Sequence, residues 1–215
     1  MPSCAGGSPV AERALAARPF ILGLTGSIGM GKSAVAAMLR GLGVPVFDAD
    51  AAVHQLQGPG GALLPAIEAA FPGTTGPDGV DRPRLGAAVF GDPARLRGLE
   101  AIVHPAVAAL RRQFLADHAA APLVVFDIPL LFEKGGEGDV DAVAVVSAPE
   151  AVQRERVLAR PGMTAGKFAQ ILALQVPDAE KRRRADHVID TGTSLAETRH
   201  AVQQLVHRLT GERPS

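Results

Sequence analysis

Short apolar runs alternate with helix-like stretches along most of this chain. The runs are apolar at most positions, which is typical of strands that helices cover on both faces; they occupy residues 20–25, 44–47, 123–127, 142–146 and 187–190. Apolar residues at helical spacing predict helices between them, at residues 33–41, 51–56, 149–160, 165–175, 178–185 and 195–211. Strands joined by helices predict an α/β fold in three layers, with a parallel sheet in the middle and right-handed crossovers.

An inserted helical subdomain is predicted over about residues 60–120. Its pattern is helical except for a turn-rich patch at 72–79, and a glycine-rich break at 58–61 precedes it. The folded domain as a whole is expected to span residues 20–215. Residues 1–19 are rich in Ala, Gly, Ser and Pro, and they predict a flexible tail.

The junction between the first predicted strand and the first helix carries the most specific motif in the chain. Residues 26–33 read G-S-I-G-M-G-K-S, the spacing of a phosphate-binding loop. The glycines let the backbone curl so that N–H groups point at an anion, and the following helix adds its positive end. Lys32 is expected to reach the outer phosphates of ATP, and Ser33 to hold Mg²⁺. The predicted ATP-binding residues of this loop are Gly26, Gly29, Met30, Gly31, Lys32, Ser33 and Ala34.

The same segment also fits the dinucleotide fingerprint G-x-G-x-x-A of a dehydrogenase, at residues 29–34. Asp48 and Asp50 follow at about the distance of a ribose-binding acid. A dinucleotide fingerprint follows its strand tightly, however, whereas residues 25–28 intervene here. The Lys32–Ser33 pair has a role only in a phosphate loop, and the phosphate loop is therefore favoured.

Acidic residues follow two of the predicted strands. Because the carboxyl ends of parallel strands meet at one edge of the sheet, Asp48, Asp50 and Asp127 are expected near the phosphate loop. Asp48 and Asp50 stand two apart in a predicted extended segment, so their side chains should point in opposite directions. Asp50 is favoured as the base that accepts the proton of the acceptor hydroxyl, with Asp48 supporting either Asp50 or the water shell of the metal. The alternative is that both residues cap the next helix. Asp127 is expected to anchor Mg²⁺, against the alternative of a turn residue.

Arginines on the predicted helix 149–160 suggest a lid. Arg156 and Arg160 are four residues apart and share a face, and Pro161-Gly162 then ends the helix. A mobile segment over about 150–178 that closes over the triphosphate is expected, with a solvated surface as the alternative. The basic run 181–184 is interpreted as a solvated helix face.

Composition excludes several kinds of partner. The formal net charge is zero and Phe is the only aromatic residue type, which argues against nucleic acid. No apolar run approaches the ~20 residues that span a bilayer, so no membrane contact is expected. The single Cys4 fits a reducing, cytoplasmic setting. His54 and His104 lack the spacing of a metal site. For His104 two interpretations stay open, a helix-boundary or packing residue and a contact to substrate. Oligomeric state stays open.

The ordered set of motifs resembles the dephospho-CoA kinase family of phosphate-loop (P-loop) kinases over about residues 20–210. The matching segments are 24–33, 48–50, 81–90, 99–105, 127–133, 153–160, 175–181 and 185–192. The resemblance implies a P-loop kinase fold with an inserted helical substrate domain and a lid. It also implies phosphorylation of the ribose 3′-hydroxyl of dephospho-CoA by ATP with Mg²⁺, giving coenzyme A and ADP.

The resemblance also assigns roles to single residues. Asp50 is the proposed base, and Lys32 and Arg156 are expected to stabilise the transferring charge. The remaining assignments are Arg160 and Asp190 for ATP, and Asp48, His54, Arg82, His104 and Leu130 for the substrate. His54 stands where many relatives carry arginine, and Thr191 replaces a commoner asparagine.

Two alternatives remain beside this family. One is another P-loop kinase that acts on a nucleoside or nucleotide. The other is a GTP-gated switch, against which the absence of an Asn-Lys-x-Asp guanine signature counts.

Overall fold

The computed structural model describes residues 18–211. Most of the predicted flexible tail 1–19, including Cys4, lies outside the described residues. Arg18, at the start of the described chain, is tied to the domain, because its guanidinium donates to both carboxylate oxygens of Asp141 at 2.7 and 2.8 Å. In residues 18–211 no helix combines the length and apolar character needed to cross a membrane.

A five-stranded parallel sheet forms the centre of the domain, which confirms the predicted α/β fold. Its order is β2–β5–β1–β6–β7, and its strands are β1 (Phe20–Thr25), β2 (Val46–Asp48), β5 (Leu123–Asp127), β6 (Ala142–Ser147) and β7 (His187–Asp190). Strand β2 begins at Val46 rather than at Val44 as predicted. Asp48 pairs in register with Asp127 and Ser147 with Asp190, so the strand ends are level.

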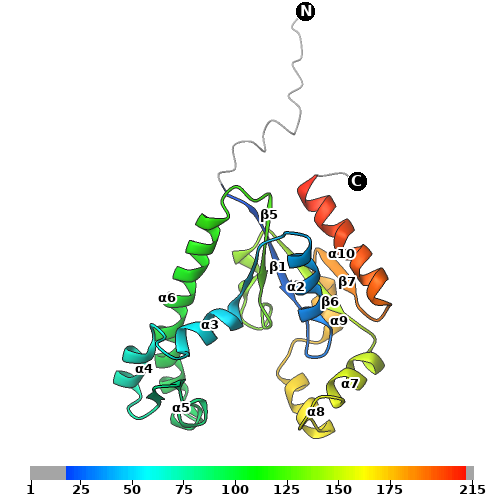
Figure 1. Cartoon of the computed structure of the whole chain (residues 1–215). Coiled ribbons are helices and arrows are strands. Elements are labelled where there is room, and N and C mark those ends of the chain that lie inside the picture. Colours follow the sequence, from blue (N-terminus) through cyan, green and yellow to red (C-terminus); the bar gives the residue numbers. More distant parts are fainter. Residues whose placement is uncertain (1–17, 212–215) are drawn as a thin grey trace, which may run out of the picture.

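Strict alternation along the strands sends side chains to two apolar layers. Leu22 and Leu24 of β1 pack with α2 (Lys32–Gly41) and α10 (Leu195–Thr210) on one face. Ile21 packs on the other face with α6 (Pro93–Asp117). Figure 1 shows the sheet between these helices. The predicted three-layer arrangement is therefore present.

The segment after β2 builds a second apolar cluster beside the sheet. It contains α3 (Ala49–Gln57), α4 (Leu64–Ala70), α5 (Arg82–Val89) and the first half of α6. The buried members of its cluster are Leu56, Leu63, Ile67, Phe71 and Leu85. Val107 and Leu110 of α6 belong to this cluster and to the layer against the sheet, so α6 connects the two.

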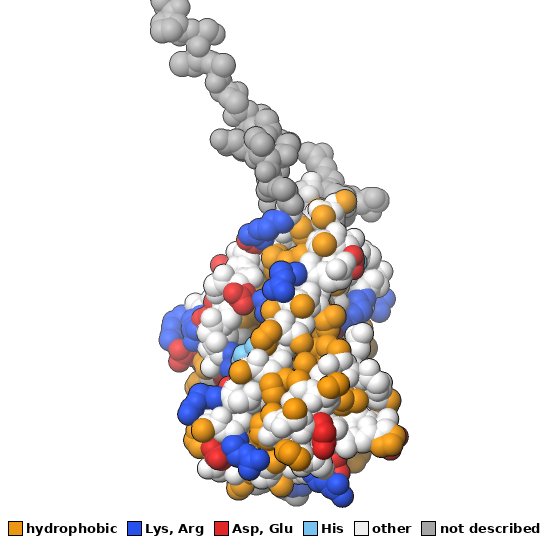
Figure 2. All heavy atoms as spheres, turned by 90° about the vertical axis from the view of Figure 1, so that its left-hand side faces the viewer, with side chains coloured by type: hydrophobic (Ala, Val, Ile, Leu, Met, Phe, Trp, Pro, Cys, Tyr) orange, Lys and Arg blue, Asp and Glu red, His pale blue; other side chains and the backbone are white. Residues whose placement is uncertain are grey.

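Two features of this segment differ from the sequence prediction. The turn-rich patch contains a short antiparallel hairpin, β3 (Thr75–Gly76) with β4 (Gly79–Val80). Helix α6 continues for 25 residues through Pro105, so residues 104–105 do not mark a helix boundary. None of the residues of α6 is buried, and Figure 2 shows a band of apolar side chains on this face of the molecule.

Helices α7 (Glu150–Leu158) and α8 (Ala165–Ala173) project from the carboxyl end of β6, on the opposite side from α4 and α5 (Figure 1). We call residues 150–175 the α7–α8 arm. Helix α7 ends at Leu158, so Arg160 lies beyond it rather than on its last turn. The α9 helix (Asp178–Arg184) returns the chain to the sheet, and the short 3₁₀ helix η2 (Gly136–Asp139) precedes β6. A capping box, Ser194 with Glu197, opens α10 (Leu195–Thr210).

Candidate active site

The phosphate loop leaves β1 and turns into α2 with two glycines in the left-handed region. Gly29 has φ 79° and Gly31 has φ 88°, values that side chains disfavour. A Cβ atom on Gly29 would also lie 2.4 Å from Cγ2 of Val157 in α7. The loop therefore requires glycine here for two reasons, its backbone conformation and its contact with the arm.

A cavity of ≈ 450 Å³ opens beside this loop and is lined from three directions. The loop forms one wall, Asp50 of α3 and Pro129 after β5 form another, and the arm forms the third. The predicted site residues that line it are Gly26, Gly29, Gly31, Lys32, Ser33, Asp50, Arg156 and Arg160. The structure thus brings the loop, the proposed base and two arginines to one cavity.

Asp127 and Lys32 form an ion pair at the end of β5. Asp127 is only 4% exposed. Burial raises the pKa of its carboxyl group, and the hydrogen bond from Lys32 opposes that shift. The hydroxyl of Ser33 and the carboxylate of Asp127 are oxygen donors of the kind Mg²⁺ prefers, and one or two protein ligands are usual where phosphates supply the rest. These two residues fit the predicted metal.

The prediction that one extended segment carries both Asp48 and Asp50 holds for Asp48 and is wrong for Asp50. Strand β2 ends at Asp48, whose Oδ1 accepts a hydrogen bond from the Ala51 N–H at 2.9 Å and caps α3. This cap turns the chain at once, so Asp50 already lies in the first helical turn. The capping alternative holds for Asp48, which also lies 3.7 Å from Arg40. Asp50 is exposed and lines the cavity.

Arg156 is held by a threonine that sequence reasoning treated only as a replacement. Its guanidinium donates to Oγ1 and to the carbonyl oxygen of Thr191, at 3.1 and 2.6 Å. The Thr191 hydroxyl in turn donates to the carbonyl of Met30 in the phosphate loop at 2.6 Å. Arg156 is therefore part of a partly buried network and is not a freely solvated side chain. Met30 is buried in the core and contributes to the loop through its backbone.

The predicted solvated face 181–184 is wrong for its first residue. Lys181 is fully buried, and its Nζ lies 2.8 Å from Oε1 of Glu133. Burial disfavours the charge of Glu133, but hydrogen bonds from Lys181 and from the Val176 N–H outweigh it and lower the pKa of this carboxyl group. The arginines that follow, 182–184, are exposed. The pair fixes the chain where the arm rejoins the sheet.

Four of the five residues predicted for the substrate are exposed, and the fifth, Asp48, is half-buried. Arg82, at the start of α5, donates to Nδ1 of His54 in α3 at 2.7 Å, so the structure brings these two together. His104 lies within α6 and is exposed, and Leu130 is 38% exposed just before the buried Leu131. None of the four lines the cavity beside the phosphate loop.

Asp190 and Ala34 also lie outside the lining of that cavity. Asp190 ends β7, and its Oδ1 accepts from the Gly192 N–H at 2.7 Å, which closes a tight turn. Gln153 and Gln175 contact the loop although no role was predicted for them. A signal existed for Gln153, because this amide shares the buried face of α7 with Val157, four residues later.

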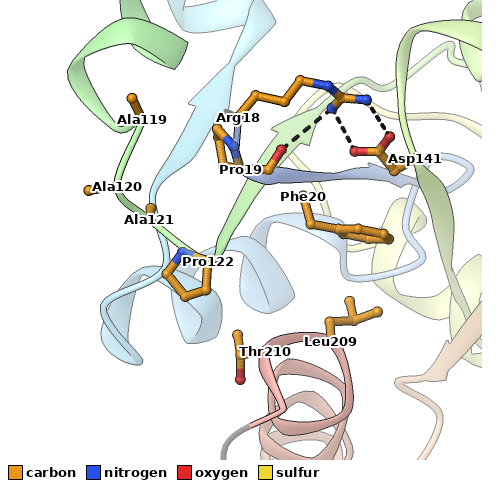
Figure 3. Close-up of a pocket in the computed structure, with 10 residues that line it drawn as sticks. All are labelled: Arg18, Pro19, Phe20, Ala119, Ala120, Ala121, Pro122, Asp141, Leu209 and Thr210. Atoms are coloured by element: carbon orange, nitrogen blue, oxygen red, sulfur yellow. Dashed lines mark hydrogen bonds and ion pairs between the residues drawn. The ribbon is translucent and has the colours of Figure 1, made fainter. Parts of the chain in front are cut away.

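A second cavity, of ≈ 420 Å³, lies at the other edge of the sheet, where the strands begin (Figure 3). The Arg18–Asp141 pair and the apolar side chains of Phe20 and Leu209 line it. The Arg18 guanidinium and the Ile21 N–H hold the pKa of Asp141 below its usual value, against the effect of burial. Both charges are thus satisfied by each other, and this cavity lacks the groups that phosphoryl transfer needs.

Comparisons with known proteins agree with this geometry. A family model described as dephospho-CoA kinase matches residues 20–197. A protein of Novosphingobium aromaticivorans named dephospho-CoA kinase is 73% identical over 92% of this chain and 98% of its own length. One of that name from Mesorhizobium japonicum is 57% identical over 91% and 100%.

Solved structures share the fold. A crystal structure from Thermus thermophilus superposes with a TM-score of 0.79 at 40% identity, over 90% of this chain and 100% of the other. A shikimate kinase from Acinetobacter baumannii, with a TM-score of 0.52 at 15% identity over 94% and 99%, shares the fold alone. The predicted P-loop kinase is confirmed, and the dehydrogenase interpretation is not supported. With a family model that covers most of its length and relatives above half identity, the chain belongs to the dephospho-CoA kinase family.

Proposed function

We propose that this chain transfers the γ-phosphoryl group of ATP to the ribose 3′-hydroxyl of dephospho-CoA, giving coenzyme A and ADP. Membership of the family supports ATP-dependent phosphorylation of dephospho-CoA. The observation that carries the residue assignments is the cavity that joins the phosphate loop to Asp50, Arg156 and Arg160. Phosphoryl transfer depends mainly on alignment and on neutralisation of charge, and this cavity offers both.

The phosphate loop would bind the triphosphate through its N–H groups and the positive end of α2. Ser33 and Asp127 would hold Mg²⁺, which supplies charge neutralisation when bound. Lys32 now neutralises Asp127 and lines the cavity, so its ammonium group can turn from the carboxylate to the outer phosphates. Asp190 is proposed beside the adenine.

Asp50 would accept the proton of the attacking hydroxyl. Its carboxylate is exposed to the cavity, and Asp48 fixes the turn of α3 that carries it. A carboxylate positioned in this way contributes about 10²–10⁴-fold to rate. Arg156 and Arg160 would cover the charge that moves between the phosphates and the hydroxyl, with the segment 150–178 acting as a lid.

The segment about 60–120 is proposed to bind dephospho-CoA. The Arg82–His54 pair supplies a guanidinium group directed from α5, and a guanidinium suits a phosphate-bearing ligand. His104 and Leu130 are exposed and stay proposed contacts on this side. We likewise propose that the protein acts in the cytoplasm.

The test is release of ADP from ATP with and without dephospho-CoA, with the product identified by mass and by the position of the new phosphate. A panel of nucleosides and nucleotides as acceptors separates this reaction from that of other P-loop kinases, and competition by GTP tests the switch alternative. ADP release that depends on dephospho-CoA, with a 3′-phosphorylated product, is expected. Equal release with other acceptors, or none with dephospho-CoA, would reject the proposal.

A further inference from the structure

The tip of the phosphate loop is held by two glutamines from opposite ends of the α7–α8 arm. Gln153 of α7 donates from Nε2 to the carbonyl oxygen of Ile28 at 2.7 Å. Gln175, just after α8, accepts with Oε1 from the N–H of Ile28 at 3.1 Å. We propose that Gln153 and Gln175 are positioning residues that set the conformation of the phosphate loop and couple it to the arm. The kinetic part of this inference depends on the proposed function.

The hydrogen bond from Gln153 to Ile28 is not an incidental surface contact, because Gln153 is buried. Gln153 is only 4% exposed and shares the buried face of α7 with Val157. A buried amide requires hydrogen-bond partners, and here Ile28 supplies one. The next loop residue, Gly29, also packs directly on α7, since a Cβ atom there would lie 3.0 Å from the carbonyl oxygen of Gln153. Helix α7 therefore contacts two successive residues of the loop.

Gln175 contacts the loop from the fixed end of the arm. The next residue, Val176, donates its N–H to Oε1 of Glu133 at 2.9 Å, and Glu133 pairs with the buried Lys181. This anchor holds the position from which Gln175 reaches Ile28. Gln153 lies in α7, at the other end of the arm, so the two glutamines relate the arm to the loop at two points.

The two contacts decide the orientation of one peptide unit on each side of Ile28. N–H groups of a phosphate loop normally point at the bound anion, but the N–H of Ile28 points at Gln175. The carbonyl of Ile28 is taken up by Gln153. Loss of either contact frees a peptide unit to rotate within the loop, which would misplace the neighbouring donors that bind phosphate.

The opposite hydrogen-bond roles of the glutamines allow a paired test. Gln175→Glu keeps an acceptor for the Ile28 N–H, whereas Gln153→Glu removes a donor and sets a carboxylate against the Ile28 carbonyl. Both variants add one carboxylate near the triphosphate, but Gln153 is buried and Gln175 only partly buried, so Gln153→Glu also carries a desolvation cost. Gln153→Met removes the donor without adding a charge and should lower kcat in the same direction, which separates the hydrogen bond from the charge. A kcat at least about tenfold lower for Gln153→Glu than for Gln175→Glu is expected, with the KM for dephospho-CoA unchanged in both.

Hydrogen exchange of the Ile28 amide, measured without substrates, tests the contact independently of activity. Gln175→Met removes the acceptor at similar volume and should speed this exchange about tenfold. Gln170→Met, at an exposed glutamine on α8, is the matched control and should leave it unchanged. Thermal unfolding verifies that each variant is folded.

Equal kcat values for the two glutamate variants, or unchanged Ile28 exchange in Gln175→Met, would overturn the inference. If Gln153→Glu does not fold, the exchange result decides alone. Faster Ile28 exchange in Gln175→Met, in a protein that fails to phosphorylate dephospho-CoA, would support the contact and reject the proposed function instead.

Discussion

The phosphate loop and the His54–Arg82 pair differ in what holds them in place. The loop is fixed by its own glycine geometry and by contacts from the arm and from Thr191, most of them partly or fully buried. The His54–Arg82 pair is exposed, and one side-chain hydrogen bond joins its members. We call the phosphate loop with its contacts the donor half of the site, and the segment that carries His54 and Arg82 the proposed acceptor half. The donor half is thus fixed largely through its backbone, whereas the acceptor half depends on side chains that water can reach.

The largest effect is expected at Asp50, where the two halves would meet. Asp50→Asn should lower kcat by about 10²-fold or more, because the amide cannot accept the hydroxyl proton, while the KM for ATP stays unchanged. Steady-state kinetics with both substrates measures this. Asp78→Asn, an exposed acid in the hairpin, is the matched control and should behave as wild type. An Asp50→Asn variant with normal turnover would remove Asp50 from this role.

The next largest effect is expected at the Lys181–Glu133 ion pair, which anchors the α7–α8 arm where it rejoins the sheet. Lys181→Ala leaves the partly buried carboxylate of Glu133 charged without its ion-pair partner, which lowers the unfolding free energy by about 3 kcal/mol at neutral pH. Because the pKa of Glu133 is lowered on folding, the wild-type contribution is full above about pH 4.3 and is lost as pH falls through the folded value. Urea unfolding at several pH values measures both.

Arg183→Ala, an exposed residue of the same helix, is the control for that experiment. It should change the unfolding free energy by less than about 0.5 kcal/mol. If Lys181→Ala were equally mild, the arm would not be anchored by this pair. The donor half would then be held in place no more firmly than the acceptor half, against the contrast drawn above.

The same contrast explains how much the sequence could predict. The strands and the phosphate loop were predictable because their signals are local: an apolar run, a glycine spacing, a cap. The burial of Lys181 was not, because Glu133 lies far earlier in the chain and nothing in the basic run marks its first member. The position of Asp50 was missed because a single cap, Asp48, turned the chain two residues sooner than the pattern implied.

The contacts that shape the site were hidden for a related reason. Gln153, Gln175 and Thr191 stand in segments that match the family, but no contact was predicted for them, and each acts on the backbone of a residue distant in sequence. Hydrogen bonds to backbone atoms leave no complementary residue to detect. The loop could therefore be recognised from the sequence, but what holds it required the structure.

Within the loop, Gly29→Ala separates close packing from backbone strain. It places a Cβ atom 2.4 Å from Cγ2 of Val157 at a left-handed position, so the loop or α7 must shift. This shift should raise the KM for ATP about tenfold, in addition to a strain of about 1–2 kcal/mol that lowers stability. Gly43→Ala has the same strain, with φ 77° and nothing within 4 Å of the added atom. It should lose stability without a change in the KM for ATP. Similar kinetics in the two variants would contradict direct packing of the loop on the arm.

The smallest effect is expected in the acceptor half. Arg82→Ala should raise the KM for dephospho-CoA about fivefold, because an ion pair made by an exposed guanidinium contributes at most about 1 kcal/mol. The KM for ATP should not change. Arg97→Ala, an exposed arginine of α6, is the matched control. Added salt should raise the KM for dephospho-CoA more in the wild type than in Arg82→Ala, because salt screens the charge of the exposed guanidinium. If Arg82→Ala instead raised the KM for ATP, Arg82 would belong to the donor half, and the proposed division of the site would fail.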